Sequence, residues 1–318
     1  MLLLRQAHGN APSAAYPWET VATTAIDNPS GSSALLSDGA RLGPVELTVT
    51  GLERSLAFYT GVIGLELLRR DGNVAALGAG GEELVVLHEE PGAAAATRTA
   101  GIYHYALLFP SREELARAAL RIMRARAPID GTSDHGTHEA IYLPDPDGIG
   151  IELAADRPRE LWPSYEDSEF ARGGPSPLDV NALLETVAGQ EPPERTAAGL
   201  RVGHVHLHVG DLEAATRFYR DGVGFEVMAT LPTAAFASFG RYHHHLAYNL
   251  WRGRDVPPAP AGAVGLRHWT VLLSDDRELE RVRARLEGLG APVEQGDGAL
   301  LASDPSGIAV RLLAAGAG

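Results

Sequence analysis

The sequence predicts an α+β fold built from four β-α-β-β-β modules, two in each half of the chain. The prediction depends on an internal repeat. Residues 43–66 align without a gap on residues 203–226 and share ten of twenty-four positions. In the same way, the segment GIYHYALLF from Gly101 matches GLRHWTVLL from Gly265. A repeat that recurs at fixed offsets indicates duplicated structural units.

Each module is expected to begin with a strand, continue into an amphipathic helix and end in short strands separated by glycine. In the first module, Leu52, Leu56 and Phe58 have the spacing of one helix face. Residues 145–153, DPDGIGIEL, and 304–312, DPSGIAVRL, predict the last hairpin of each half. In these turns proline presets φ and glycine supplies positive φ before an alternating strand.

Composition changes along the chain predict the domain boundaries. Residues 1–41 are rich in small and polar residues without apolar periodicity, which is typical of an extension. Residues 42–156 and 201–315 are expected to be the two domains. Residues 157–200 carry several prolines and mixed charges, and we interpret them as the linker.

Charge and cysteine content exclude several function classes. The net charge is −14 without a basic block, so nucleic acid and anionic membranes are not expected partners. No apolar run reaches membrane-spanning length, and the short Met1–Leu4 run resembles no signal peptide, so we expect a cytoplasmic protein. Because the chain has no cysteine, His, Asp and Glu must hold any metal ion.

The repeated motifs are the opening strand, L-E-x-x-x-x-F-Y at the helix, G-[LF]-E after it, and D-P-[DS]-G before the last strand. Together they resemble the vicinal oxygen chelate superfamily of glyoxalases, bleomycin resistance proteins and extradiol dioxygenases. The similarity is greatest to its two-domain catechol 2,3-dioxygenase-like members. The resemblance implies two glyoxalase-like half-barrels and a divalent metal centre. It covers nearly all of both predicted domains.

The resemblance also implies where the metal ligands lie. It places a histidine near the start of each opening strand and a carboxylate four residues after the glycine of the last hairpin. The four opening-strand positions hold Pro44, His104, His204 and His268, and the carboxylate positions hold Glu152 and Arg311. Proline and arginine cannot ligate a metal. Modules one and four cannot form a site together, and pairing in chain order leaves both sites incomplete. Modules two and three together supply His104, Glu152 and His204, so we expect crossed pairing, two with three and one with four, with a structural role for His268.

Further site residues follow from the same resemblance. A tyrosine ten residues before the glutamate ligand corresponds to Tyr142. The upstream histidine that contacts substrate or oxygen corresponds to His135, with His138 as the alternative. The acid–base histidine corresponds to His244 in the segment RYHHHLAYNLW.

Strand alternation predicts which neighbouring histidines face the metal. On a strand, His243 and His245 would point away from His244. The same rule puts His206 on the face of His204, within reach of the pocket.

Each of these residues also has a purely structural interpretation. Strand histidines are more often hydrogen-bonded core or surface residues than ligands. The run His243–His245 could bind metal adventitiously, Glu152 could face solvent, and Tyr142 could fill the core.

The resemblance implies an extradiol dioxygenase that uses Fe(II), or alternatively Mn(II), to cleave a small aromatic diol with O2. Two rival functions stay open on this scaffold. One is a glyoxalase-type isomerase or transferase with another metal, and the other is a non-catalytic protein that binds small molecules. A homo-oligomer is compatible with the sequence.

Overall fold

The structure is a computed structural model that describes residues 35–163, 168 and 174–315. Most of the predicted N-terminal extension, 1–41, and part of the predicted linker, 157–200, therefore lie outside the described residues. In the rest of the linker, a short 3-10 helix η2 (Arg159–Leu161) and α4 (Val180–Glu185) are present.

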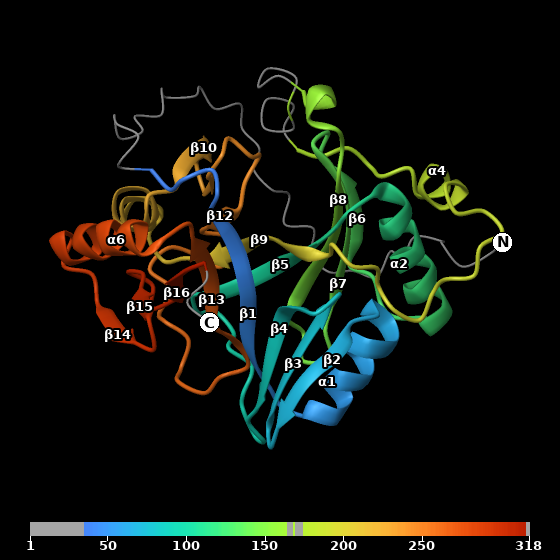
Figure 1. Ribbon diagram of the computed structural model, residues 1–318, viewed down its shortest axis with the longest axis horizontal. Helices are drawn as coiled ribbons and strands as arrows, with labels where there is room; N and C mark the ends of the chain where they lie inside the picture. Colours follow the sequence, from blue (N-terminus) through green and yellow to red (C-terminus); the bar gives the residue numbers. More distant parts are fainter. Residues whose placement is uncertain (1–34, 164–167, 169–173, 316–318) are drawn as a thin grey trace.

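The four predicted modules are present in chain order (Figure 1). Module one comprises β1 (Arg41–Val49), α1 (Leu52–Phe58), η1 (Tyr59–Ile63), β2 (Glu66–Asp71), β3 (Val74–Ala79) and β4 (Glu82–Glu89). Module two comprises β5 (Gly101–Phe109), α2 (Arg112–Ala125), β6 (Gly131–Asp134), β7 (His138–Pro144) and β8 (Gly150–Asp156). Module three comprises β9 (Arg201–His208), α5 (Leu212–Thr216), η3 (Arg217–Val223), β10 (Glu226–Leu231), β11 (Ala234–Ser238) and β12 (Leu246–Asn249). Module four comprises β13 (Gly265–Leu273), α6 (Asp276–Gly288), β14 (Val293–Gly296), β15 (Ala299–Ser303) and β16 (Ala309–Ala314).

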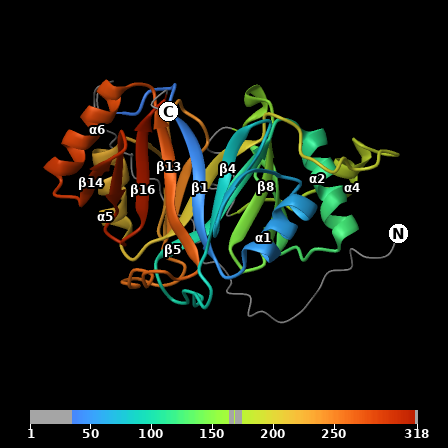
Figure 2. The same ribbon diagram turned by 60° about the horizontal axis from the view of Figure 1, so that its bottom comes forward.

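The strands form two eight-stranded sheets, and each sheet takes four strands from each half of the chain. One sheet has the order β14-β15-β16-β13-β1-β4-β3-β2, and the other has the order β10-β11-β12-β9-β5-β8-β7-β6. Figure 2 shows β16 and β13 of the C-terminal half beside β1 and β4 of the N-terminal half. The predicted crossed pairing of modules is therefore confirmed. The boundaries 42–156 and 201–315 enclose pairs of modules along the chain, and as domain limits they stay a prediction.

Helices α2 and α6 each begin at a side chain that caps them. Ser111 Oγ accepts a hydrogen bond from the Glu114 amide (3.3 Å) at the start of α2. Asp275 accepts one from the Glu278 amide (2.8 Å) at the start of α6. Such caps satisfy amides that have no partner inside the helix. Figure 2 shows α6 at one end of the molecule and α1, α2 and α4 at the other.

The repeated D-P-[DS]-G turns join modules that lie in different sheets. Asp145 Oδ1 accepts from the Asp147 and Ile149 amides, both at 2.8 Å, before Gly148 adopts φ +82°. Its other oxygen accepts from the hydroxyl of Tyr59 (3.2 Å). Asp304 and Tyr219 form the equivalent bond in the second half (2.9 Å). Each half of the chain thus carries an equivalent buried tyrosine–aspartate bond between its two modules.

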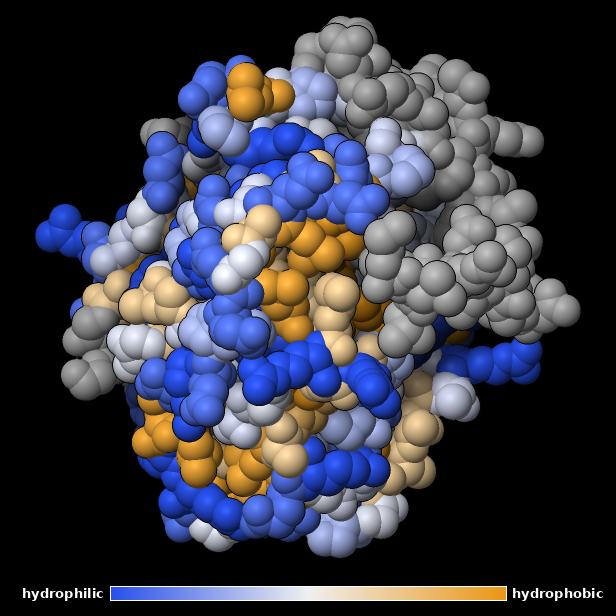
Figure 3. All heavy atoms as spheres, turned by 90° about the vertical axis from the view of Figure 1, so that its right-hand side faces the viewer, coloured by the Kyte–Doolittle hydropathy of each residue, from blue (hydrophilic) through white to orange (hydrophobic). Residues whose placement is uncertain are grey.

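The surface at the α1 and α2 end shows small hydrophobic patches interrupted by hydrophilic residues (Figure 3). Of the described large hydrophobic side chains, the most exposed is Leu161, at 64%. No helix in the described ranges is long and apolar enough to cross a bilayer.

Candidate metal centre

Three neighbouring strands carry the predicted ligands to one side of the second sheet. In its order, β5 lies between β9 and β8. The antiparallel register places His104 of β5 opposite His206 of β9, and the parallel register places Ala106 of β5 beside Glu152 of β8. Because the β5–β9 pair joins the two halves of the chain, the site exists only where modules two and three meet.

The predicted ligand atoms converge. His104 Nε2 and His204 Nε2 lie 3.2 Å apart. Glu152 Oε2 lies 3.1 Å from the first of these nitrogens and 3.0 Å from the second. Exposure of the three residues is 7%, 2% and 1% for His104, His204 and Glu152.

This donor set fits a metal ion. Adjacent ligands of an octahedral ion, at metal–ligand distances of about 2.1 Å, are separated by about 3.0 Å. Burial lowers the pKa of His204, so its imidazole is neutral at pH 7. Burial alone would raise the pKa of Glu152, but His204, His104 and His138 outweigh it and hold that pKa well below its usual range. An ionised carboxylate and imidazole nitrogens that meet out of solvent are suited to a cation between them.

The second oxygen of Glu152 faces another histidine pair. Glu152 Oε1 lies 3.1 Å from His138 Nε2. The His135 ring stacks on His138 with centroids 4.3 Å apart. His135, His138 and Glu152 also have donor atoms close enough to hold a metal ion, so the carboxylate is shared by two groups.

The remaining predicted residues also line the pocket. His135 Nε2 lies 2.8 Å from the hydroxyl of Tyr142. The His244 ring lies 4.3 Å from that of His204, between centroids. The pocket is a cavity of about 600 Å³, and aromatic residues Tyr103, Phe236 and Trp251 contribute to its walls.

The alternation expected for His243–His245 is wrong, because β12 begins only at Leu246. His243 does not point away from the site: its ring stacks on His138 with centroids 4.7 Å apart. His245 instead stacks on Phe239, at 3.7 Å between centroids. A turn precedes the strand here, and period-two reasoning does not apply to a turn.

His206 lines the pocket, as expected from alternation along β9. Its Nε2 lies 2.8 Å from the side-chain amide nitrogen of Asn249. His206 Nε2 therefore accepts a hydrogen bond from Asn249 and is not available to a metal ion. Asn249 was not singled out from the sequence, because an isolated amide carries no motif.

The corresponding positions in the other sheet form a different cluster. His268 of β13 lies 3.3 Å from Glu46 Oε1, and His88 of β4 lies 2.6 Å from Glu46 Oε2. Pro44 and Arg311 also lie in strands of this sheet. His268 is thus placed away from His104, Glu152 and His204, and its structural role stays a prediction.

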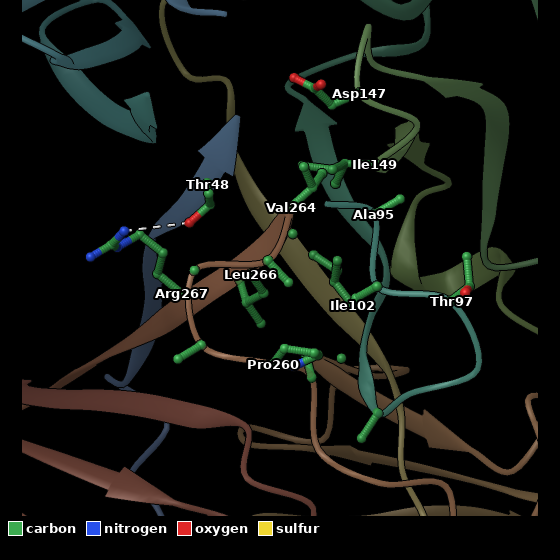
Figure 4. Close-up of a pocket in the computed structure, with 18 of the residues that line it drawn as sticks. Thr48, Ala95, Thr97, Ile102, Asp147, Ile149, Pro260, Val264, Leu266 and Arg267 are labelled. Atoms are coloured by element: carbon green, nitrogen blue, oxygen red, sulfur yellow. Dashed lines mark hydrogen bonds between the residues drawn. The ribbon is translucent and has the colours of Figure 1, made fainter. Parts of the chain in front are cut away.

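Figure 4 shows a neighbouring cavity of about 690 Å³, bounded by the segments that precede β5 and β13. Most of its labelled side chains are aliphatic or small. Arg267 is directed toward Thr48, to which it donates a hydrogen bond (3.4 Å), and away from the other labelled residues. Both candidate metal-binding groups of the described residues line the first cavity instead.

Comparisons with known proteins identify the family of this chain. Residues 41–153 and 201–312 match the sequence profile of the Glyoxalase/Bleomycin resistance protein/Dioxygenase superfamily. The chain is 38% identical over 275 residues to a Bacillus subtilis protein named catechol-2,3-dioxygenase, covering 85% of this chain and 95% of the relative. It is 27% identical over 196 residues to metapyrocatechase from Geobacillus stearothermophilus, covering 60% and 53%.

Solved structures show the same fold. A putative dioxygenase from Bacillus subtilis superposes with a TM-score of 0.62 at 15% identity, covering 88% of this chain and 86% of that chain. Glyoxalase I from Zea mays superposes with a TM-score of 0.56 at 22% identity, covering 87% and 92%.

The chain belongs to the Glyoxalase/Bleomycin resistance protein/Dioxygenase superfamily. Within it, the chain is a dioxygenase-like enzyme, since its 38% identical relative, which it covers almost completely, carries that name.

Proposed function

We propose that this chain is an extradiol ring-cleaving dioxygenase that uses Fe(II) to insert O2 into a catechol-type aromatic diol. The observation that carries the proposal is the convergence of His104, Glu152 and His204 in a cavity. Two imidazoles and one carboxylate on one face are the ligand set of non-heme Fe(II) oxygenases. Mn(II) is the alternative ion for these ligands. The 38% identity to a catechol-2,3-dioxygenase supports the substrate class.

A bound ion would supply Lewis acidity and electronic coupling between the diol and O2. His104, Glu152 and His204 would hold it, and His138 would orient the carboxylate through Oε1. Both atoms of O2 enter a ring-opened product, so the diol supplies the electrons and no external reductant is consumed.

His244 is proposed to accept the proton of a diol hydroxyl. Burial lowers the pKa of His244 well below its usual range, so the ring is neutral and can accept a proton at pH 7. Its place beside His204 puts it next to the metal-binding atoms.

Tyr142 and His135 are proposed to bind oxygen atoms of the substrate or of O2. The bond of 2.8 Å between them holds the tyrosine hydroxyl at the pocket wall. In this proposal His135 Nε2–H donates to the tyrosine oxygen, and the hydroxyl keeps its own hydrogen to donate to negative charge that develops on oxygen. The aromatic walls, including Phe236 and Trp251, would exclude water around a planar ring.

Oxygen uptake tests the proposal. The protein is purified and loaded with Fe(II) without air, then mixed with catechol and substituted catechols while dissolved O2 and the yellow ring-fission absorbance are recorded. We expect O2 consumption equal to the diol consumed. Zn(II)-loaded protein is the matched control, because Zn(II) can occupy such ligands but has no redox chemistry. Absence of uptake by the iron-loaded protein with every diol would overturn the proposal.

A further inference from the structure

A chain of side-chain contacts leads from His244 out of the pocket to the end of β8. His244 Nδ1 lies 2.9 Å from His243 Nδ1. His243 Nε2 lies 3.3 Å from Asp156 Oδ1. The side chain of His243 is 8% exposed and that of Asp156 is 24% exposed. The chain therefore runs from a buried ring to a carboxylate near the surface.

The carboxylate fixes the direction of the first hydrogen bond. Burial alone would raise the pKa of Asp156, but the hydrogen bonds from His243 and Tyr242 lower it. The Tyr242 hydroxyl lies 2.9 Å and 3.0 Å from the two carboxylate oxygens. An ionised carboxylate can only accept, so His243 Nε2 must carry a hydrogen and donate it.

The tautomers of both rings follow. Burial lowers the pKa of His243 to about 3, so this ring is neutral at pH 7 and has a single N–H. With that hydrogen on Nε2, Nδ1 of His243 is an acceptor. The nearby His244 Nδ1 must then donate, which leaves the lone pair of His244 on Nε2.

Stacking holds the central ring of this chain in place. The His243 ring stacks on that of His138, with centroids 4.7 Å apart, and the rings of Tyr242 and Trp162 contact it at 3.9 Å and 5.2 Å between centroids. The packing restricts rotation of His243, so its two nitrogens stay directed to different partners.

We propose that Asp156 and His243 are positioning residues that fix His244 in the Nδ1–H tautomer and so present its Nε2 as the proton acceptor of the pocket. The tautomer assignment does not depend on the proposed function. Its use in catalysis rests on the proposed function. A proton taken from a diol hydroxyl would reside on His244 Nε2, and the resulting positive ring would be stabilised through Nδ1–H, His243 and Asp156.

Nitrogen NMR of the histidine rings tests the tautomer without any turnover. Spectra are recorded on the full-length, Zn(II)-loaded protein labelled with 15N-histidine, and the variant His244→Gln identifies the signals of His244. We expect a protonated Nδ1 and an unprotonated Nε2 in the wild-type protein at pH 7. Asp156→Asn can present an amide donor to His243 Nε2, which should reverse the direction of both hydrogen bonds between His244, His243 and residue 156. His243→Phe should remove both hydrogen bonds.

Glu46→Gln is the matched control. Glu46 also accepts from a histidine, His88, at 2.6 Å, but it lies in the other sheet. This variant should leave the His244 signals unchanged. Circular dichroism checks folding, and His243→Phe carries the test if Asp156→Asn does not fold.

Kinetics of the iron-loaded variants provide the second measurement. Asp156→Asn should lower kcat about 10- to 100-fold with KM within about twofold, because a wrong tautomer impairs proton transfer more than binding. Asp156→Glu should restore part of the lost kcat, and Glu46→Gln should have wild-type kcat.

An Nε2–H tautomer in the wild-type protein, or unchanged His244 signals in both Asp156→Asn and His243→Phe, would overturn the inference. Failure of wild-type O2 uptake would instead contradict the dioxygenase proposal and leave the tautomer result intact.

Discussion

Glu152 directs its two carboxylate oxygens to different partners. Oε2 faces His104 and His204, and Oε1 faces His138. The residue is 1% exposed, so an uncompensated charge here would be costly. A metal ion between the three ligands balances that charge, which makes Glu152 the residue on which the site depends most.

Replacing Glu152 by Gln should therefore lower metal affinity by about 100-fold or more, because the only anionic ligand of the three is lost. Calorimetric titration with Zn(II) and elemental analysis after Fe(II) loading measure this. Glu46→Gln, which changes the carboxylate between His88 and His268, should leave metal content at the wild-type level. Equal metal content in Glu152→Gln and wild-type protein would place the metal elsewhere.

Replacing His244 by Gln should separate proton transfer from metal binding. The ring contacts His204 but is not one of the convergent donors. We expect unchanged iron content with kcat lowered by about 100-fold or more, since general acid–base catalysis typically contributes that much. Stopped-flow absorbance of the iron-loaded variant measures kcat. Loss of iron in this variant would indicate that His244 is a ligand.

At the scale of elements, the D-P-[DS]-G turns link sequence, buried bonds and pH dependence. Burial raises the pKa of Asp145 and of Asp304, each to about 6. The ordinary value is 3.8, so the folded state binds these protons more tightly than the unfolded chain does. Their contribution to stability is present in full below about pH 3.8 and is lost as the pH rises through about 6.

Asp145→Asn should remove its share of this dependence. The difference in unfolding free energy between wild type and variant should fall as the pH rises from about 4 to about 6. Urea unfolding at a series of pH values measures the difference. Asp304→Asn provides an internal comparison, because its turn is built in the same way. A difference that is constant with pH for both variants would contradict the account.

The elements were largely predictable because each has a local cause in the sequence. The repeat predicted four modules, and glycine after D-P predicted the last turns. The start of β12 at Leu246 was not predictable from alternation, because the preceding turn is set by contacts such as His245 on Phe239. The contact of His243 with Asp156 could not be predicted either, because these residues lie 87 positions apart in the sequence.

At the scale of the whole molecule, every sheet depends on both halves of the chain. The pairs β5–β9 and β1–β13 join them in antiparallel register. The buried Tyr59–Asp145 and Tyr219–Asp304 bonds run within each half and connect the two sheets. Crossed pairing could be inferred from sequence because Pro44 and Arg311 stand at ligand positions that the family resemblance implies and cannot ligate a metal, so pairing in chain order leaves both sites incomplete.

Separate halves should therefore not fold alone. In a fragment of residues 1–163, β1 loses its partner β13 and β5 loses its partner β9, so both become edge strands. Exposed edge strands favour aggregation. Co-expression of the two fragments should restore a compact complex that binds metal. Size-exclusion chromatography and circular dichroism measure this. A well-folded, monomeric N-terminal fragment that binds metal by itself would contradict crossed pairing as the basis of the site.

The central claim is that modules two and three hold the iron between His104, Glu152 and His204. Anomalous diffraction at the iron edge, from crystals of the Fe(II)-loaded protein grown without air, tests it most directly. We predict a peak about 2.0–2.2 Å from the three donor atoms. A peak between His135, His138 and Glu152, or beside Glu46 in the other sheet, with none at the predicted position, would contradict the account.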